Sequence, residues 1–301
     1  PVAAAKARMT TPQNTRLGIW QMIVTTLVFA VQDGISRHLG SHYHVTMVVM
    51  VRFWFFALFA MALAARSPGG MAAAARSAFP WVQLSRGVIL VAEIAVMLVA
   101  FVKLGLIEAH AVFTCYPLLV AALSGPILGE KVGWRRWSAI LVGFGGVLII
   151  LEPGFGVFSP WALVPLLSAT MFAVYGLLTR YVARKDSANV SFFYTGVVGA
   201  VAMTPFGLMH WTWMSPGDWG WMALLCCTAA LSHWLLIKSL AVAEASDVQP
   251  FAYLQIVWAS AIGLYVFGET LRLNVAIGAG IVVAAGIFTL WRQRVREKAA
   301  L

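Results

Sequence analysis

Long apolar stretches, separated by short polar joins, occupy most of this 301-residue chain. A helix that crosses a membrane needs roughly 20 mostly apolar residues. Ten stretches meet this requirement, namely 17–36, 45–65, 81–102, 109–128, 134–151, 160–181, 188–209, 219–237, 248–267 and 273–291. Several joins carry helix breakers, as in Ser67-Pro68-Gly69-Gly70. The pattern predicts an all-α integral membrane protein with ten transmembrane helices.

Composition agrees with this prediction. Hydrophobic residues make up 61% of the chain and charged residues 11%, whereas about a quarter of a soluble domain is charged. The net charge of +10 comes from Lys and Arg residues scattered beside apolar stretches, which is typical of membrane anchors and argues against nucleic acid as a partner. Cys115, Cys226 and Cys227 lie within apolar stretches and lack metal-ligand spacing. We therefore expect a lipid environment, no metal and no cofactor.

The chain contains an internal duplication. The stretch from Phe29 to Arg37 shares Phe-Ala-Val, an aliphatic residue, a small hydroxyl residue and Arg with the stretch from Phe172 to Arg180. The pair Gly129-Glu130 returns as Gly268-Glu269, each time followed by a glycine-rich helix. Since five helices per half is an odd number, the second half must enter the membrane upside down, which gives two inverted five-helix repeats.

The duplication also defines the expected divisions of the chain. They are an N-terminal tail (1–16), a first repeat (17–151), a linker (152–159), a second repeat (160–291) and a basic tail (292–301). With ten helices, 17 Lys and Arg residues fall on the side of the N-terminus and three on the other side. Because positive residues collect on the cytoplasmic side, we expect both termini to be cytoplasmic.

This arrangement of repeats, each with a Gly-Glu pair and a glycine-rich last helix, resembles the ten-helix drug/metabolite transporter superfamily of the EamA type. The resemblance implies a secondary transporter of small metabolites that works by alternating access around a central cavity in the bacterial inner membrane. The nearest likeness is to the branch that exports amino acids, aromatic ones included. A multidrug or cationic-compound exporter is the alternative, and a monomer is compatible with either. An intramembrane enzyme is a further alternative, but the chain has no His-Glu-x-x-His, Gly-x-Ser-x-Gly or carboxylate-dyad motif.

Ionisable residues within a membrane are costly, so each is a candidate for function. Glu93, near the middle of the third stretch, is a candidate for binding a substrate ammonium or a proton, or else a buried structural carboxyl. Asp33 and Arg52 lie toward the outer boundary of neighbouring helices and are expected to form a structural ion pair. His233 is a weaker candidate, because a lone histidine is more often a packing residue. Glu130 and Glu269 are interpreted as helix-end or gating residues.

Further candidates follow from the repeat. Inverted repeats place the substrate near the midplane, where equivalent helices face each other. Counting back from Glu130 and Glu269, Tyr116 pairs with Gln255. Pro117 frees a backbone carbonyl beside Tyr116, and Trp258 lies one turn beyond Gln255. The paired motifs also align Gln32 with Tyr175. We expect the substrate between the fourth and ninth helices, with interhelical hydrogen bonding as the alternative role of these side chains.

Overall fold

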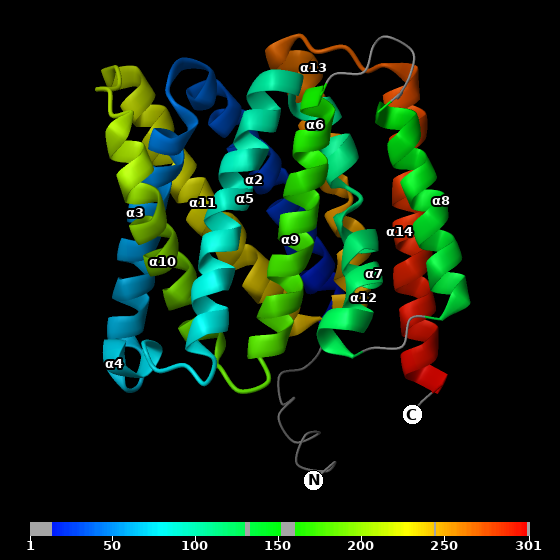
Figure 1. The fold of residues 1–301 in the computed structure, drawn as a ribbon, viewed down its shortest axis with the longest axis horizontal. Helices are drawn as coiled ribbons and strands as arrows, with labels where there is room; N and C mark the ends of the chain where they lie inside the picture. The colour runs from blue at the N-terminus through cyan, green and yellow to red at the C-terminus, as the bar shows by residue number, and fades with distance from the viewer. Residues whose placement is uncertain (1–13, 130–132, 152–159, 244, 300–301) are drawn as a thin grey trace.

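Helices make up all the regular structure in the described part of the chain. The computed structural model describes residues 14–129, 133–151, 160–243 and 245–299. The first half contains α2 (Thr15–His42), α3 (Val45–Arg66), α4 (Gly70–Ala74), α5 (Pro80–Leu104), α6 (Leu106–Phe113), α7 (Tyr116–Leu128) and α8 (Trp134–Leu151). The second half contains the 3-10 turn η1 (Pro160–Ala162), α9 (Leu163–Val182), α10 (Ala188–Met209), α11 (Pro216–Val242), α12 (Ala245–Ala252), α13 (Leu254–Phe267) and α14 (Leu273–Ala299). The long helices stand side by side in one bundle (Figure 1), which confirms the predicted all-α fold.

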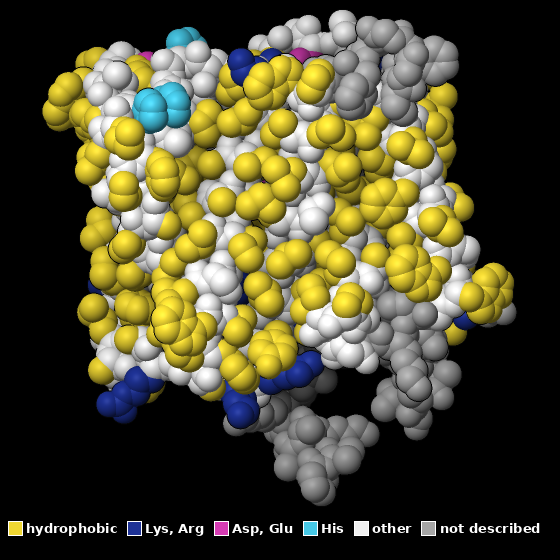
Figure 2. Space-filling view, in the orientation of Figure 1, with side chains coloured by type: hydrophobic (Ala, Val, Ile, Leu, Met, Phe, Trp, Pro, Cys, Tyr) yellow, Lys and Arg dark blue, Asp and Glu magenta, His cyan; other side chains and the backbone are white. Residues whose placement is uncertain are grey.

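The bundle has the dimensions and surface of a membrane protein. Nine segments of the described chain are helical, long and apolar enough to cross a membrane, and α6 with α7 counts as one of them. The tenth is α8, whose apolar part Trp137–Leu151 is shorter. These ten segments follow the predicted order. Apolar side chains cover the middle of the face shown in Figure 2, and Lys and Arg lie at its edges, more of them along the lower edge than along the upper one.

Some helices run beyond the predicted boundaries. α2 continues from the predicted end at residue 36 to His42, and α11 continues to Val242. The extra turns of α2 are polar, and in one of them the Ser41 hydroxyl donates a hydrogen bond of 2.8 Å to the Arg37 carbonyl oxygen. α14 likewise continues to Ala299, so most of the expected basic tail is helical. Residues 1–13 of the expected N-terminal tail and the linker 152–159 lie outside the described residues.

The contacts between helices follow an inverted pseudo-two-fold symmetry. α3 packs against its own counterpart α10, and α8 packs against its counterpart α14. The contact of α2 with α11 is matched by that of α9 with α5, and the contact of α2 with α13 by that of α9 with α7. η1 contacts α5 and α6, so the second half begins at the membrane face opposite to the start of α2. This arrangement is the one that the duplication predicts.

The bundle has two ends, which face opposite sides of the membrane. The terminal face is the one where α2 begins and α14 ends, along the lower edge of Figure 1. The opposite face is the one where α6 begins and α13 ends.

Glycines bring α8 and α14 into backbone contact. A Cβ added to Gly146 would lie 2.8 Å from the carbonyl oxygen of Gly278, and one added to Gly278 would lie 2.6 Å from the carbonyl oxygen of Gly146. Neither position has room for a side chain. Small residues allow this close packing, which replaces the hydrophobic effect as the source of helix association in lipid.

Candidate functional site

The fourth and ninth membrane segments are both interrupted near their middle. The fourth segment breaks at Thr114 and Cys115, between α6 and α7, and the ninth breaks at Tyr253, between α12 and α13. Pro117 lies in the first turn of α7 and has no N–H to donate to the preceding turn. In a membrane such interruptions are tolerated where the backbone lines a cavity.

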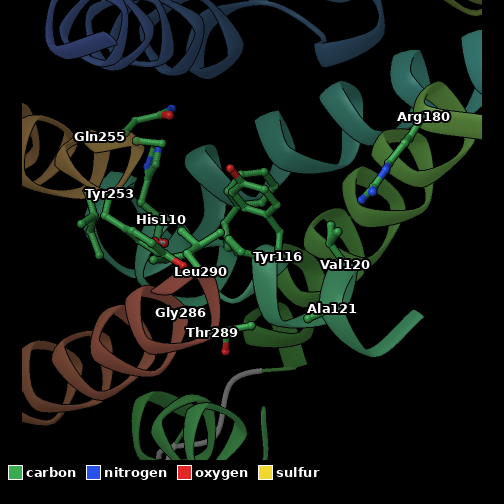
Figure 3. Close-up of a pocket in the computed structure, with 15 residues that line it drawn as sticks. His110, Tyr116, Val120, Ala121, Arg180, Tyr253, Gln255, Gly286, Thr289 and Leu290 are labelled. Atoms are coloured by element: carbon green, nitrogen blue, oxygen red, sulfur yellow. Dashed lines mark hydrogen bonds between the residues drawn. The ribbon is translucent and has the colours of Figure 1, made fainter. Parts of the chain in front are cut away.

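A cavity lies where these two interruptions face each other. It encloses about 200 Å³, and α14 and the end of α9 complete its wall. Gln255 and His110 lie together at one side and Arg180 lies at the other (Figure 3). The lining residues are His110, Phe113, Thr114, Tyr116, Pro117, Val120, Ala121, Arg180, Ala252, Tyr253, Gln255, Ile256, Gly286, Thr289 and Leu290.

Aromatic rings form much of the wall. The ring of Tyr116 lies 5.4 Å from that of Phe113 and meets the ring of Phe172 edge to face at 5.0 Å. The side chain of Tyr253 is 9% exposed, and its hydroxyl has no hydrogen-bond partner among the described residues. A Cβ on Gly286 would lie 1.8 Å from that hydroxyl, so only glycine leaves room for the phenol. The cavity therefore offers flat apolar surfaces, while the Tyr253 hydroxyl is buried against Gly286.

Asp33 lies directly behind this wall. Its Oδ2 is 3.1 Å from Nε2 of His110 on α6 and accepts a hydrogen bond of 3.1 Å from Nε2 of Gln255 on α13. Both partners line the cavity. Asp33 therefore joins helices of both repeats.

The expected ion pair between Asp33 and Arg52 does not form. No salt bridge within 4.0 Å joins the two among the described residues; Arg52 interacts electrostatically with Asp33, Cys226 and Glu93. The reason is the packing of α2, which places the carboxylate against α6 and α13 instead of against α3. Arg52 is thus a cation shared by two acidic residues.

Glu93 is deeply buried but does not line the cavity. Its side chain is 4% exposed, and its Oε1 accepts a hydrogen bond of 2.6 Å from the hydroxyl of Ser168 on α9. Its electrostatic neighbours are Arg52 and Asp33. Glu93 therefore belongs, with Asp33 and Arg52, to a group of buried charges behind the cavity, here called the charged cluster.

Gln32 and Tyr175, the other pair related by the repeat, also lie outside the cavity lining. Gln32 accepts a long hydrogen bond of 3.5 Å from Ser232 on α11. The hydroxyl of Tyr175 accepts a hydrogen bond of 3.1 Å from Arg86, whose guanidinium also lies 5.2 Å from the tyrosine ring centre. Both side chains make contacts between helices, which was the alternative role expected for them.

His233 and Trp258 take part in packing. Nδ1 of His233 lies 2.9 Å from the carbonyl oxygen of Ala229, and the ring packs against Phe29 and Phe56. Trp258 is absent from the cavity lining, and its buried Nε1 has no hydrogen-bond partner among the described residues.

A group of interactions, here called the latch, joins α2, α6 and α13 near the opposite face. The carboxylate of Glu269 forms an ion pair with Arg37 and accepts hydrogen bonds from the backbone N–H groups of Leu106 (2.8 Å) and Ile107 (2.9 Å). These N–H groups begin α6, where the helix dipole favours a negative charge. Glu269 therefore caps a half-helix, in agreement with its interpretation as a helix-end residue; Glu130 lies outside the described residues.

The backbone around the latch is shaped to admit the carboxylate. A Cβ on Gly105, whose φ is +91°, would lie 2.6 Å from Oε1 of Glu269, and one on Gly263 would lie 2.7 Å from Oε2. The guanidinium of Arg37 also lies 4.1 Å from the ring centre of Phe267. Arg37 follows Asp33 by one helical turn, so the latch stands between the charged cluster and the opposite face.

Sequence reasoning missed His110, Tyr253 and the role of Arg37. His110 is an ionisable residue inside an apolar stretch, and the argument that singled out Glu93 applies to it equally. Tyr253 lies two positions before Gln255, so the search around the ninth helix could have included it. Tyr253 lines the cavity because the ninth helix is interrupted at this residue. The apolar pattern of the sequence does not indicate that interruption.

The chain is similar to known transporters along nearly its whole length. A sequence profile of the EamA-like transporter family matches it twice, over residues 16–152 and 159–291. It is 24% identical over 277 residues to an S-adenosylmethionine uptake transporter of Rickettsia prowazekii (strain Madrid E), covering 92% of this chain and 93% of the relative. It is also 34% identical over 193 residues to a riboflavin transporter of Vibrio cholerae, covering 62% of this chain and 63% of the relative.

Similarity extends to a solved structure. A protein of known crystal structure superposes with a TM-score of 0.60 at 19% sequence identity, covering 93% of this chain and 98% of the other. At this identity, the likeness supports the fold alone.

Proposed function

Because the chain belongs to the EamA-like transporter family, we propose that it is a secondary transporter that takes up a small metabolite carrying a flat nitrogen heterocycle and polar appendages. S-adenosylmethionine and riboflavin, which are named in the relatives, both combine a fused flat nitrogen ring system with a polar appendage. The appendage is a ribose with a sulfonium and an amino-acid group in the first and a ribityl chain in the second. Family membership favours a transporter over the intramembrane enzyme considered above. The amino-acid export expected from the sequence finds no support in relatives named for other substrates and, in part, for uptake.

The aromatic wall of the cavity is the observation that carries this proposal. Tyr116, Phe113 and Tyr253 offer the faces and edges on which a heterocycle stacks, since aromatic rings attract one another in offset and edge-to-face arrangements. Gln255 and His110, which lie together at one side of the cavity, supply hydrogen-bonding groups for its polar edge. A few polar groups in an aromatic lining are typical of small-molecule sites.

The size of the cavity indicates how binding would proceed. Its volume of about 200 Å³ is below the range of about 300–1,000 Å³ that is usual for ligand sites. The ring of such a substrate would enter first, and the helices around the two interruptions would separate to admit the remainder. Alternating access provides that movement.

We also propose an orientation of the protein in the membrane. The terminal face carries most of the Lys and Arg residues, so we assign it to the cytoplasm of a bacterial inner membrane. A reporter enzyme active only in the cytoplasm, fused after Leu301, should be active. A periplasmic reporter at the same position should be silent, and the reverse result would overturn the assignment.

Uptake into proteoliposomes tests the substrate class. Labelled S-adenosylmethionine and riboflavin would be compared with an aromatic amino acid and a cationic drug, which represent the two exporter hypotheses. Tyr116→Ala and Gln255→Ala would be measured beside Trp20→Ala, whose side chain is 66% exposed on the surface of α2. We expect saturable uptake of at least one heterocycle, with KM raised about tenfold or more in the cavity variants, a loss of roughly 1.4 kcal/mol. Preference for the amino acid or the drug would overturn the proposal.

A further inference from the structure

The His110 ring contacts two acceptor oxygens, and a neutral imidazole has only one N–H to donate to them. Nδ1 of His110 lies 2.9 Å from the carbonyl oxygen of Leu106. A carbonyl oxygen only accepts, as an ionised carboxylate does. Nε2 lies 3.1 Å from Oδ2 of Asp33. A neutral imidazole has one N–H and can donate to only one of these two oxygens, whereas one added proton, on His110 or on Asp33, satisfies both contacts.

We propose that the Asp33–His110 pair is a proton-binding site and that its proton is transported with the substrate. Both partners of this carboxylate, His110 and Gln255, line the cavity, so loss of the proton changes the wall that meets the substrate. Loss of the proton would also weaken the contact that Asp33 on α2 makes with His110 on α6. This inference rests on the proposed transport function and adds an energy source to it.

One bound proton makes the net charge of the charged cluster zero. Arg52 on α3 and Glu93 on α5 interact electrostatically with Asp33 and with each other. With both acids ionised, Arg52 and a protonated His110 leave the cluster neutral, and removing the proton leaves one net negative charge. Uncompensated charge is costly in a membrane interior. The remaining titratable groups that face the cluster are Cys226 and His233 on α11, which lie beside Arg52, and Tyr253 and Tyr116 at the cavity.

The position of the pair suits alternating access. The latch lies one turn farther along α2 and separates Asp33 from the opposite face, whereas the cavity runs from His110 toward Arg180 at the end of α9. In this state the proton therefore exchanges with the terminal face. The aligned position in the second repeat is Gly176, so the carboxylate is not a requirement of the fold.

Transport under a pH gradient tests the coupling. Proteoliposomes with no membrane potential would be given an outside pH one unit below the inside pH, with S-adenosylmethionine or riboflavin as the probe. For one proton per substrate we expect about tenfold accumulation. Asp33→Asn should abolish accumulation, because its amide can donate to a neutral His110 but has no proton to release. Asp218→Asn is the matched control, since Asp218 also contacts a histidine, His38, at 3.4 Å but outside the cavity.

A second measurement needs neither substrate nor transport. The imidazole ¹⁵N resonances of the purified protein, with those of His110 assigned from the His110→Gln spectrum, report whether Nδ1 and Nε2 are each bare or engaged with a proton. We expect both nitrogens to be engaged in the wild type and in Asp218→Asn. One bare nitrogen in the wild type, or undiminished accumulation by Asp33→Asn, would overturn the proton site. If neither probe is transported while the ¹⁵N result holds, the substrate class fails and the proton site stands.

Discussion

The latch should hold the opposite face of the bundle closed, and Glu269→Gln tests this directly. The glutamate accepts two backbone hydrogen bonds at the start of α6 and pairs with Arg37. Glutamine has the same shape but one acceptor oxygen and no charge. It therefore loses one backbone hydrogen bond, the ion pair and the favourable interaction with the helix dipole.

The magnitude follows from these losses. The side chains of Arg37 and Glu269 are 17% and 12% exposed, so solvent replaces their contacts poorly. A hydrogen bond to a charged group contributes about 1.5–3 kcal/mol, and a charge at a helix terminus about 0.3–2 kcal/mol. We take about 3 kcal/mol for the sum, which corresponds to a shift of roughly a hundredfold toward states open at the opposite face.

Accessibility of a cysteine beneath the latch measures that shift. Ser36→Cys places a thiol on α2 beside Arg37, at a position that is 4% exposed in the closed state. Cys115, Cys226 and Cys227 would first be replaced. A membrane-impermeant thiol reagent added to intact cells should then label this cysteine much faster when Glu269→Gln is also present.

Glu108→Gln is the matched control. Glu108 is an acidic residue in the first turn of α6, at the same face as Glu269. It pairs with Arg272 at 2.9 Å, but the two side chains are 28% and 38% exposed. Exposed pairs contribute about 0–1 kcal/mol, so labelling should change little. Equal labelling in wild type and Glu269→Gln, or an equal increase in the control, would refute the idea that the latch closes this face.

Three further outcomes are expected. Tyr253→Phe should not lower the melting temperature, because the hydroxyl that it removes is buried without a hydrogen-bond partner among the described residues; a lower melting temperature in thermal unfolding would contradict this. Gly146→Val should destabilise the protein in detergent, since a Cβ there meets the Gly278 carbonyl at 2.8 Å, whereas Gly145→Val, with open space around its Cβ, should not; equal melting temperatures would contradict this. Burial alone would raise the pKa of Asp186, but hydrogen bonds from Ser77, Gln83 and the Ala78 N–H hold that pKa below its ordinary value. The ionised carboxylate therefore stabilises the fold above the unfolded-state pKa of about 3.9, and this contribution is lost as pH falls through the folded pKa. On acidification, the melting temperature of Asp186→Asn should fall less than that of the wild type.

Much of the fold could be predicted from the chain because lipid imposes a simple rule. Each membrane segment must be apolar and helical over its length, so ten segments are visible as ten apolar stretches. The duplicated Phe-Ala-Val and Gly-Glu motifs then determine the symmetry, and the symmetry directs attention to Tyr116 and Gln255, which line the cavity. Their role in binding remains a prediction.

The partner of Asp33 could not be predicted in this way. The sequence favoured Arg52, because α2 and α3 are consecutive and antiparallel. The structure packs α2 mainly against α11 and α13, helices from the other half of the chain. The carboxylate therefore meets His110 and Gln255, and such a contact depends on how broken helices pack, which local hydrophobicity does not record.

The contacts of α3 with α10 and of α8 with α14 have a mechanical consequence. A helix that touches its own symmetry mate must meet it across the pseudo-two-fold axis. When two inverted repeats exchange their conformations, elements on that axis are displaced least, and elements far from it exchange neighbours. The tight glycine contact of α8 with α14 and the long seam of α3 with α10 would thus serve as two fixed pivots. Between them, α2 and α5, their counterparts α9 and α11, and the broken helices would form the part of the protein that rocks.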